Sequence, residues 1–210
     1  SGTANIWRMD VDGGNLKQLS RGKGDSTPTL SPDGQWVLYS SWSSGKPALW
    51  KVSIDGGEPV QISRKVVARP VVSPDGKWIA CYYQDESDNK SRIAVIPFAG
   101  GEPVIVERMA SPDFGIVRWS PDSRALTYIS TRQGVSNIWS QPLDGGEAKQ
   151  LTQFTTDQIF RFAWSCDGKQ LACERGLVIN DAVLLSSTNA KGRGFSSTPF
   201  TSALRLLHTK

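Results

Sequence analysis

The sequence predicts an all-β fold built from a repeated unit, and two recurring phrases are the basis of that prediction. The first phrase reads SPDG at residues 31–34 and 73–76, SPDS at 120–123 and SCDG at 165–168. The second reads DGG at 12–14, 55–57 and 144–146, and AGG at 99–101. Repeats of about 40–45 residues with strand-like content are typical of propeller blades, whereas helical repeats show a 3.6-residue period. We therefore expect an all-β β-propeller of four-stranded antiparallel blades, with about four blades in an incomplete or unusually small ring.

The repeat at residues 27–63 shows how one blade is composed. Its apolar and β-branched runs predict four strands, at Pro28–Ser31, Trp36–Trp42, Ala48–Ile54 and Pro59–Ile62. In the first turn, Asp33 can accept hydrogen bonds from nearby backbone, and Gly34 can take a positive φ. Asp55 and Gly56 form one of the strongest hairpin signals between the third and fourth strands.

The other repeats are assigned by the same pattern. A partial blade at 5–20 has strands at Ile6–Asp10 and Leu16–Ser20, and full blades follow at 27–63, 68–107 and 115–152. A last blade at 158–186 has strands at Ile159–Trp164, Gln170–Cys173 and Asp181–Ser186. We expect a propeller over residues 1–186 and a non-repeat basic tail over 187–210. Open ends would expose sheet edges and an apolar face, so either a small closed ring or a homo-oligomer that completes the ring is expected.

Charge and hydropathy argue against two partner classes. The tail contains four basic residues and no acid, which leaves 20 basic and 20 acidic side chains (24 − 4 = 20, against 20) in residues 1–186. Nucleic-acid binders concentrate positive charge on the binding module, so no nucleic-acid partner is expected. No apolar run approaches the roughly 20 residues of a membrane helix, so no membrane insertion is expected.

The three cysteines show no CxxC spacing. Cys81 and Cys173 occupy equivalent positions in separate repeats, which should lie too far apart for a disulfide. We expect Cys81, Cys166 and Cys173 to be buried thiols that pack as small hydrophobic side chains.

The repeated phrase resembles the PD40, or TolB-like, β-propeller family, whose motif x-D-x-x-P-x-W-S-P-D-G recurs once per blade. It is present as Asp25 followed by Pro28–Gly34, and again at Pro70–Gly76, Val117–Asp122 and Phe162–Gly168. Ser123 replaces the turn glycine once, and Cys166 replaces the proline once. The resemblance implies a binding scaffold for a protein or peptide, in bacteria often in the periplasm or another extracytoplasmic domain.

Catalytic signatures are mostly missing from the sequence. There is no GxSxG, HExxH, P-loop or Rossmann glycine pattern, and the one histidine, His208, lies in the tail. Asp25, Asp113 and Asp157 precede the first strands of three repeats, where loops open onto the channel of a propeller. They could hold a Ca²⁺ or Mg²⁺ ion that activates water, or each could cap its own loop. We expect no cofactor, and we keep a weak or promiscuous hydrolase of esters or phosphoesters as the alternative function.

The same loops contain basic residues that suit a polar or anionic partner through charge-assisted hydrogen bonds. These predicted rim residues are Arg21, Lys23, Arg64, Lys65, Arg69 and Arg108. Seven of the eight tryptophans recur at fixed repeat positions, which predicts packing between blades. Trp42 stands outside the pattern and is the candidate exposed aromatic contact. The leading prediction is thus a non-enzymatic propeller module that binds a protein or peptide at this rim.

Overall fold

The structure is a computed structural model that describes residues 3–63, 66–84, 91–102, 105–107 and 116–177. The chain divides into two compact units, Ser1–Val178 and Ile179–Lys210, and the second lies outside the described residues. The predicted strand Asp181–Ser186 and the predicted tail 187–210 therefore lie outside them too. Within the described part of the first unit, the chain forms sixteen strands and no helix, which confirms the all-β prediction. It contains no helix that could cross a membrane.

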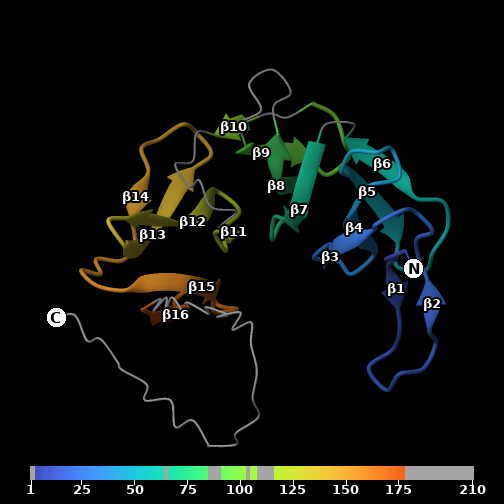
Figure 1. Cartoon of the computed structure of the whole chain (residues 1–210), viewed down its shortest axis with the longest axis horizontal. Coiled ribbons are helices and arrows are strands. Elements are labelled where there is room, and N and C mark those ends of the chain that lie inside the picture. Colours follow the sequence, from blue (N-terminus) through green and yellow to red (C-terminus); the bar gives the residue numbers. More distant parts are fainter. Residues whose placement is uncertain (1–2, 64–65, 85–90, 103–104, 108–115, 178–210) are drawn as a thin grey trace, which may run out of the picture. The chain divides into compact units, whose positions relative to one another are not determined.

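The strands form five antiparallel sheets, numbered 1 to 5 here in chain order (Figure 1). Sheet 1 has two strands, β1 (Trp7–Arg8) and β2 (Lys17–Gln18). Sheet 2 has β3 (Ser26–Leu30), β4 (Trp36–Ser41), β5 (Ala48–Ser53) and β6 (Val60–Ser63). Sheet 3 has β7 (Val66–Val72), β8 (Trp78–Gln84), β9 (Ser91–Pro97) and β10 (Ile105–Glu107). Sheet 4 has β11 (Val117–Trp119), β12 (Ala125–Arg132), β13 (Val135–Pro142) and β14 (Lys149–Gln150), and sheet 5 has β15 (Gln158–Trp164) and β16 (Leu171–Gly176).

Sheets 2, 3 and 4 are up-and-down blades, because each pairs its strands in sequence order. The turn between the first two strands is held by the same side chains each time. The Ser73 hydroxyl donates to the Asp75 carboxylate at 2.6 Å and accepts from the Trp78 N–H at 3.0 Å. Serine and aspartate repeat this arrangement at 31 and 33, 120 and 122, and 165 and 167. The hydrogen bond from serine, followed by one from the backbone, lowers the pKa of Asp33, Asp122 and Asp167 below its ordinary value.

Ser123 departs from the turn glycine and gains a contact in exchange. Gly34, Gly76 and Gly168 have φ near +70°, a conformation that favours glycine, and Ser123 adopts φ +62°. Its hydroxyl accepts a hydrogen bond of 3.0 Å from the backbone N–H of Asp75. The serine therefore joins the turn of sheet 4 to the turn of sheet 3.

The core lies between consecutive sheets. Four apolar clusters fill the interfaces of sheets 1 and 2, 2 and 3, 3 and 4, and 4 and 5. Two of the recurring tryptophans add a hydrogen bond across an interface. The indole N–H of Trp119 donates to the Val71 carbonyl at 2.9 Å, and that of Trp164 donates to the Thr127 hydroxyl at 3.2 Å. Recurrence at a fixed repeat position thus reflects packing between sheets.

Two predictions of burial fail at the ends of the described unit. Cys81 is buried, and burial raises the pKa of its thiol to about 12, but Cys166 and Cys173 are exposed. Cys173 lies on β16, which has a hydrogen-bonded neighbour on one side only among the described residues, whereas β8 lies between two strands. Trp7 is 53% exposed because β1, too, has a hydrogen-bonded neighbour on one side only among the described residues. Repeat position therefore predicts burial only where a neighbouring strand and sheet are present.

We predict different outcomes for two substitutions of Ser123. Ser123→Ala removes the hydrogen-bond acceptor and keeps the positive φ, so the free energy of unfolding should fall by about 1 kcal/mol. Ser123→Gly removes the same acceptor but relieves a left-handed conformation that costs other residues about 1 kcal/mol, so its stability should stay near that of the wild type. Urea unfolding of both variants measures the difference, and equal destabilisation would contradict the role given to φ.

Candidate functional site

Two loops meet beside sheet 2 and bring together three of the predicted rim residues. One loop, residues 20–25, joins sheet 1 to sheet 2, and the other, residues 42–47, joins β4 to β5. The backbone N–H of Trp42 donates to the Lys23 carbonyl at 3.0 Å, and the Lys23 N–H donates to the Ser43 hydroxyl at 3.0 Å. We call Arg21, Lys23 and Trp42 the rim patch, and all three side chains are exposed.

Glycine supports the exposed indole of the rim patch. Gly24 has φ +69°, and a Cβ built on it would lie 3.4 Å from Cδ1 of Trp42. The indole therefore lies directly against the loop backbone, although 52% of the residue remains exposed. An aromatic ring that is held in place yet open to solvent is well prepared for contact with a partner.

Asp25, a predicted catalytic or metal-binding residue, is a buried support of the first loop. It is 2% exposed, its Oδ2 accepts from the Gly22 N–H at 2.9 Å, and its own N–H donates to the Ala4 carbonyl at 3.0 Å. A Cβ on Gly22 would lie 2.4 Å from Asp25 Oδ1 and 2.5 Å from the Ser43 hydroxyl. Oδ1 is buried without a hydrogen-bond partner in the structure. Gly22 thus covers the carboxylate on its loop side.

The other predicted carboxylates do not assemble a described site with Asp25. Asp157 pairs with Arg175 at 3.6 Å and accepts a hydrogen bond from the Thr156 hydroxyl at 3.1 Å. Asp113 lies outside the described residues. In the part of the chain that the structure describes, no three His, Cys, Asp or Glu side chains are grouped to hold a metal ion.

The remaining rim residues are only partly described. Arg69 is exposed on β7, with φ +53°, at a shift of the β7–β8 register between Ala68 and Val71. It lines a small cleft of about 140 Å³ together with Tyr82 and Arg118. Arg64, Lys65 and Arg108 lie outside the described residues.

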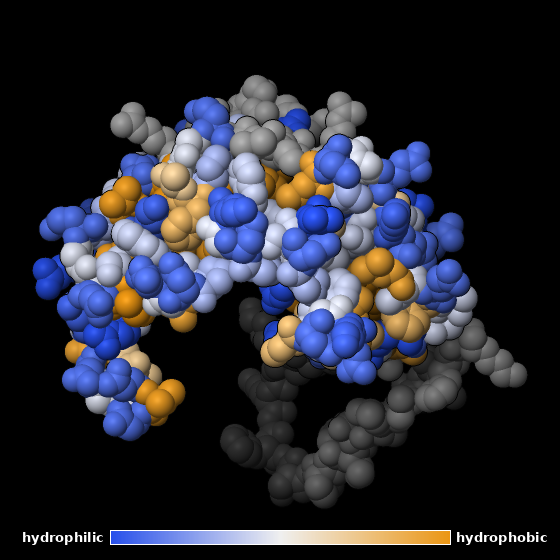
Figure 2. Space-filling model, turned by 180° about the vertical axis from the view of Figure 1, so that it is seen from behind, coloured by the Kyte–Doolittle hydropathy of each residue, from blue (hydrophilic) through white to orange (hydrophobic). Residues whose placement is uncertain are grey.

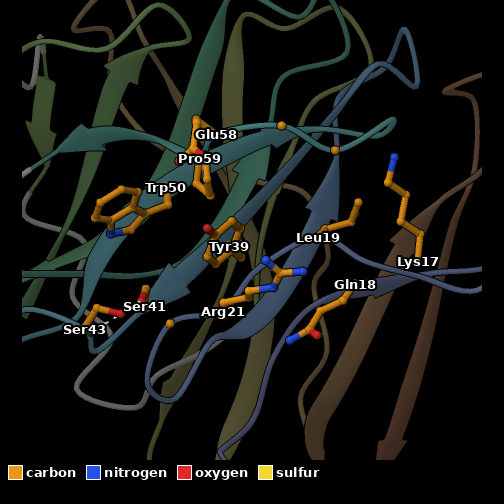
Figure 3. A pocket seen from close by; sticks show the side chains of 13 residues that line it. Lys17, Gln18, Leu19, Arg21, Tyr39, Ser41, Ser43, Trp50, Glu58 and Pro59 are labelled. Carbon is orange, nitrogen blue, oxygen red and sulfur yellow. Dashed lines mark hydrogen bonds between the residues drawn. The ribbon is translucent and has the colours of Figure 1, made fainter.

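A larger cleft, which the sequence did not predict, lies between sheets 1 and 2. We call it the intersheet cleft; its volume is about 430 Å³. Figure 3 shows side chains from both sheets turned toward it. They include Lys17, Leu19 and Arg21 from β2 and the loop after it, Tyr39, Ser41, Ser43 and Trp50 from β4, β5 and their loop, and Glu58 and Pro59 from the turn before β6. The repeat pattern assigns Trp50 to packing between blades. No feature of the sequence predicts an open space between sheets 1 and 2.

Charge and burial affect one phenol of the cleft. Burial, and after it the negative charge of Asp25, raises the pKa of Tyr39 to about 12. The Tyr39 hydroxyl therefore stays protonated at neutral pH and can donate a hydrogen bond into the cleft.

Sequence comparison links the chain to proteins named TolB. It is 28% identical over 136 residues to a TolB homologue of Chlorobium chlorochromatii, covering 63% of this chain and 30% of that protein. No family model matches the chain. The chain thus spans less than a third of this relative's length.

Structural comparison leads to the same fold. The crystal structure of TolB from Acinetobacter baumannii superposes with a TM-score of 0.65 and 23% identity, over 80% of this chain and 42% of that one. A putative TolB from Agrobacterium tumefaciens gives a TM-score of 0.60 and 25% identity, over 76% of this chain and 57% of that one. With its five antiparallel sheets packed in chain order, the chain is a TolB-like β-propeller in fold.

Proposed function

We propose that this chain is a non-enzymatic TolB-like binding module that engages a protein or peptide through the rim patch. The main supporting observation is the half-exposed Trp42 indole, which lies over Gly24 in a loop bonded to the backbone of Lys23. Tryptophan and arginine are the residue types that most often dominate binding energy at interfaces. The rim patch places one of each beside a lysine.

The chemistry of the rim patch favours an acidic partner. Arg21 and Lys23 can form charge-assisted hydrogen bonds with carboxylates, and the Trp42 ring offers apolar area that loses little conformational freedom on binding. We also propose that the repeats are of the PD40 type, because the same Ser–Asp turn occurs four times.

The hydrolase alternative has no observation in its favour among the described residues. Asp25 is covered by Gly22 and Ser43, so its carboxylate is not open to a substrate. Asp157 is engaged by Arg175. We therefore propose binding rather than hydrolysis as the function of the loops.

We further propose that copies of this chain associate through sheet 1. Side chains alternate between the faces of a strand; Ile6 packs toward sheet 2, so Trp7 and Met9 project from the other face. Leu16, beside β2, is 64% exposed. The surface seen from behind is mostly hydrophilic, with separate apolar patches (Figure 2). An exposed apolar sheet face is a typical association site.

A display experiment tests the binding function. Peptides selected on the purified chain from a random library should be rich in acidic residues. Trp42→Ala should weaken the selected peptides about tenfold or more, because anchors of this kind contribute about 2 kcal/mol, and calorimetry measures the loss. Leu30→Ala is the matched control, because Leu30 is 55% exposed and lies at the end of β3 that is away from the rim patch. Equal binding to wild type and Trp42→Ala would contradict the proposal.

Ultracentrifugation tests the association. The wild type should sediment as a dimer or larger species whose population rises with concentration. Leu16→Asp should shift the protein to monomer, because it places a charge in the apolar contact. Leu30→Asp, which adds the same charge to an exposed leucine on β3, should sediment as the wild type does. A wild type that stays monomeric at every concentration would exclude this part of the proposal.

A further inference from the structure

Three hydrogen-bonding groups face the intersheet cleft without a partner. They are the guanidinium of Arg21, the hydroxyl of Tyr39 and the indole N–H of Trp50, and none of them bonds to another group among the described residues. Arginine and the indole N–H are donors only, and the protonated Tyr39 hydroxyl can donate as well. The open groups of the cleft can therefore bind a hydrogen-bond acceptor.

The cations of the lining can receive an anionic acceptor. The lining contains two cations, Lys17 and Arg21, and one carboxylate, Glu58. The buried carboxylate of Asp25 acts on Tyr39 from behind the lining, so an anion is held by direct contact with Arg21 rather than by net charge. Lys17 donates to the backbone carbonyl of Asp55, which holds its ammonium beside the cleft. An ionised carboxylate is an acceptor-only group, and the planar fork of arginine matches its two oxygens.

Part of the remaining lining is apolar. The rings of Tyr39 and Trp50 come from neighbouring strands and pair directly across β4 and β5. Leu19 and Pro59 lie around the same space. A cleft of about 430 Å³ is within the size of small-ligand sites, and it can take a few side chains of an extended peptide.

We propose that the intersheet cleft binds an acidic peptide segment, with a carboxylate against Arg21 and the Tyr39 hydroxyl and a neighbouring apolar side chain on the partly buried ring of Trp50. The proposal rests on the proposed function and adds a second contact to it. Arg21 belongs to both the rim patch and the cleft, so one partner can reach both. Tyr39 and Trp50 belong to the cleft alone.

Two capped peptides test the chemistry. The probe is Ac-GELEG-NH2, and its neutral counterpart is Ac-GQLQG-NH2. The acidic peptide should bind and shift the NMR signal of the Trp50 indole N–H. The neutral peptide should bind at least about tenfold more weakly, because hydrogen bonds to charged groups are stronger than those between neutral groups. Free glutarate distinguishes a peptide from a small carboxylate. Glutarate binding as tightly as the acidic peptide would overturn the peptide assignment, and an unmoved Trp50 signal would overturn the cleft itself.

Variants test the residues. Arg21→Gln should weaken the acidic peptide about tenfold or more, and Tyr39→Phe about fivefold, the loss expected for one hydrogen bond. Arg124→Gln makes the same change at an exposed arginine in the turn before β12 and should leave the affinity within about twofold. Thermal unfolding confirms that each variant is folded.

The outcomes separate this proposal from the function on which it rests. Equal losses for Arg21→Gln and Arg124→Gln would show general charge attraction and overturn the cleft site. The proposed function fails independently, if Trp42→Ala leaves the affinity of the selected peptides unchanged. Loss with Trp42→Ala but none with Arg21→Gln or Tyr39→Phe would retain the rim patch and reject the cleft.

Discussion

Packing between consecutive sheets is the interaction on which the rest of this structure depends. Each sheet has apolar side chains on both faces, so a sheet alone cannot remove them from water. Most residues of β4, β8 and β12 are buried, because each of these strands lies between two strands and between two sheets. By contrast, β16 exposes most of its residues. Stability is therefore shared between neighbours rather than held within a sheet.

The candidate sites arise where this packing gives way to loops. Gly22 and Gly24 let the loop between sheets 1 and 2 approach Asp25 and Trp42 closely. That approach places Lys23 and Trp42 on one rim, and it leaves the intersheet cleft beside Arg21. The proposed binding site thus lies at an irregular junction of two regular sheets, which agrees with the general placement of binding residues on loops held by a rigid scaffold.

Much of the fold could be predicted from the sequence, because its determinants are local. The Ser–Asp turns are hydrogen-bonded within six residues, and Asp75 accepts from the backbone N–H of Lys77, as the pattern predicts for the aspartate of this turn. The hydrogen bonds of the serine were not predicted. Exposure was predicted less well: Cys173 has the repeat position of Cys81 but lacks its neighbours. The intersheet cleft depends on the distance between sheets 1 and 2, and no residue pattern predicts the distance between two packed sheets. Trp42 was predicted to be exposed because it lies outside the repeat. Trp50 was assigned to packing because it occupies a fixed repeat position.

Hydrogen exchange followed strand by strand tests the central claim most directly, because protection reports local opening. Backbone amides of β8 and β12 should exchange slowest, and those of β1 and β16 fastest, since these two outer strands have fewer packed neighbours among the described residues. Protection in β16 equal to that in β8, or protection unrelated to the position of a strand among the sheets, would contradict the account.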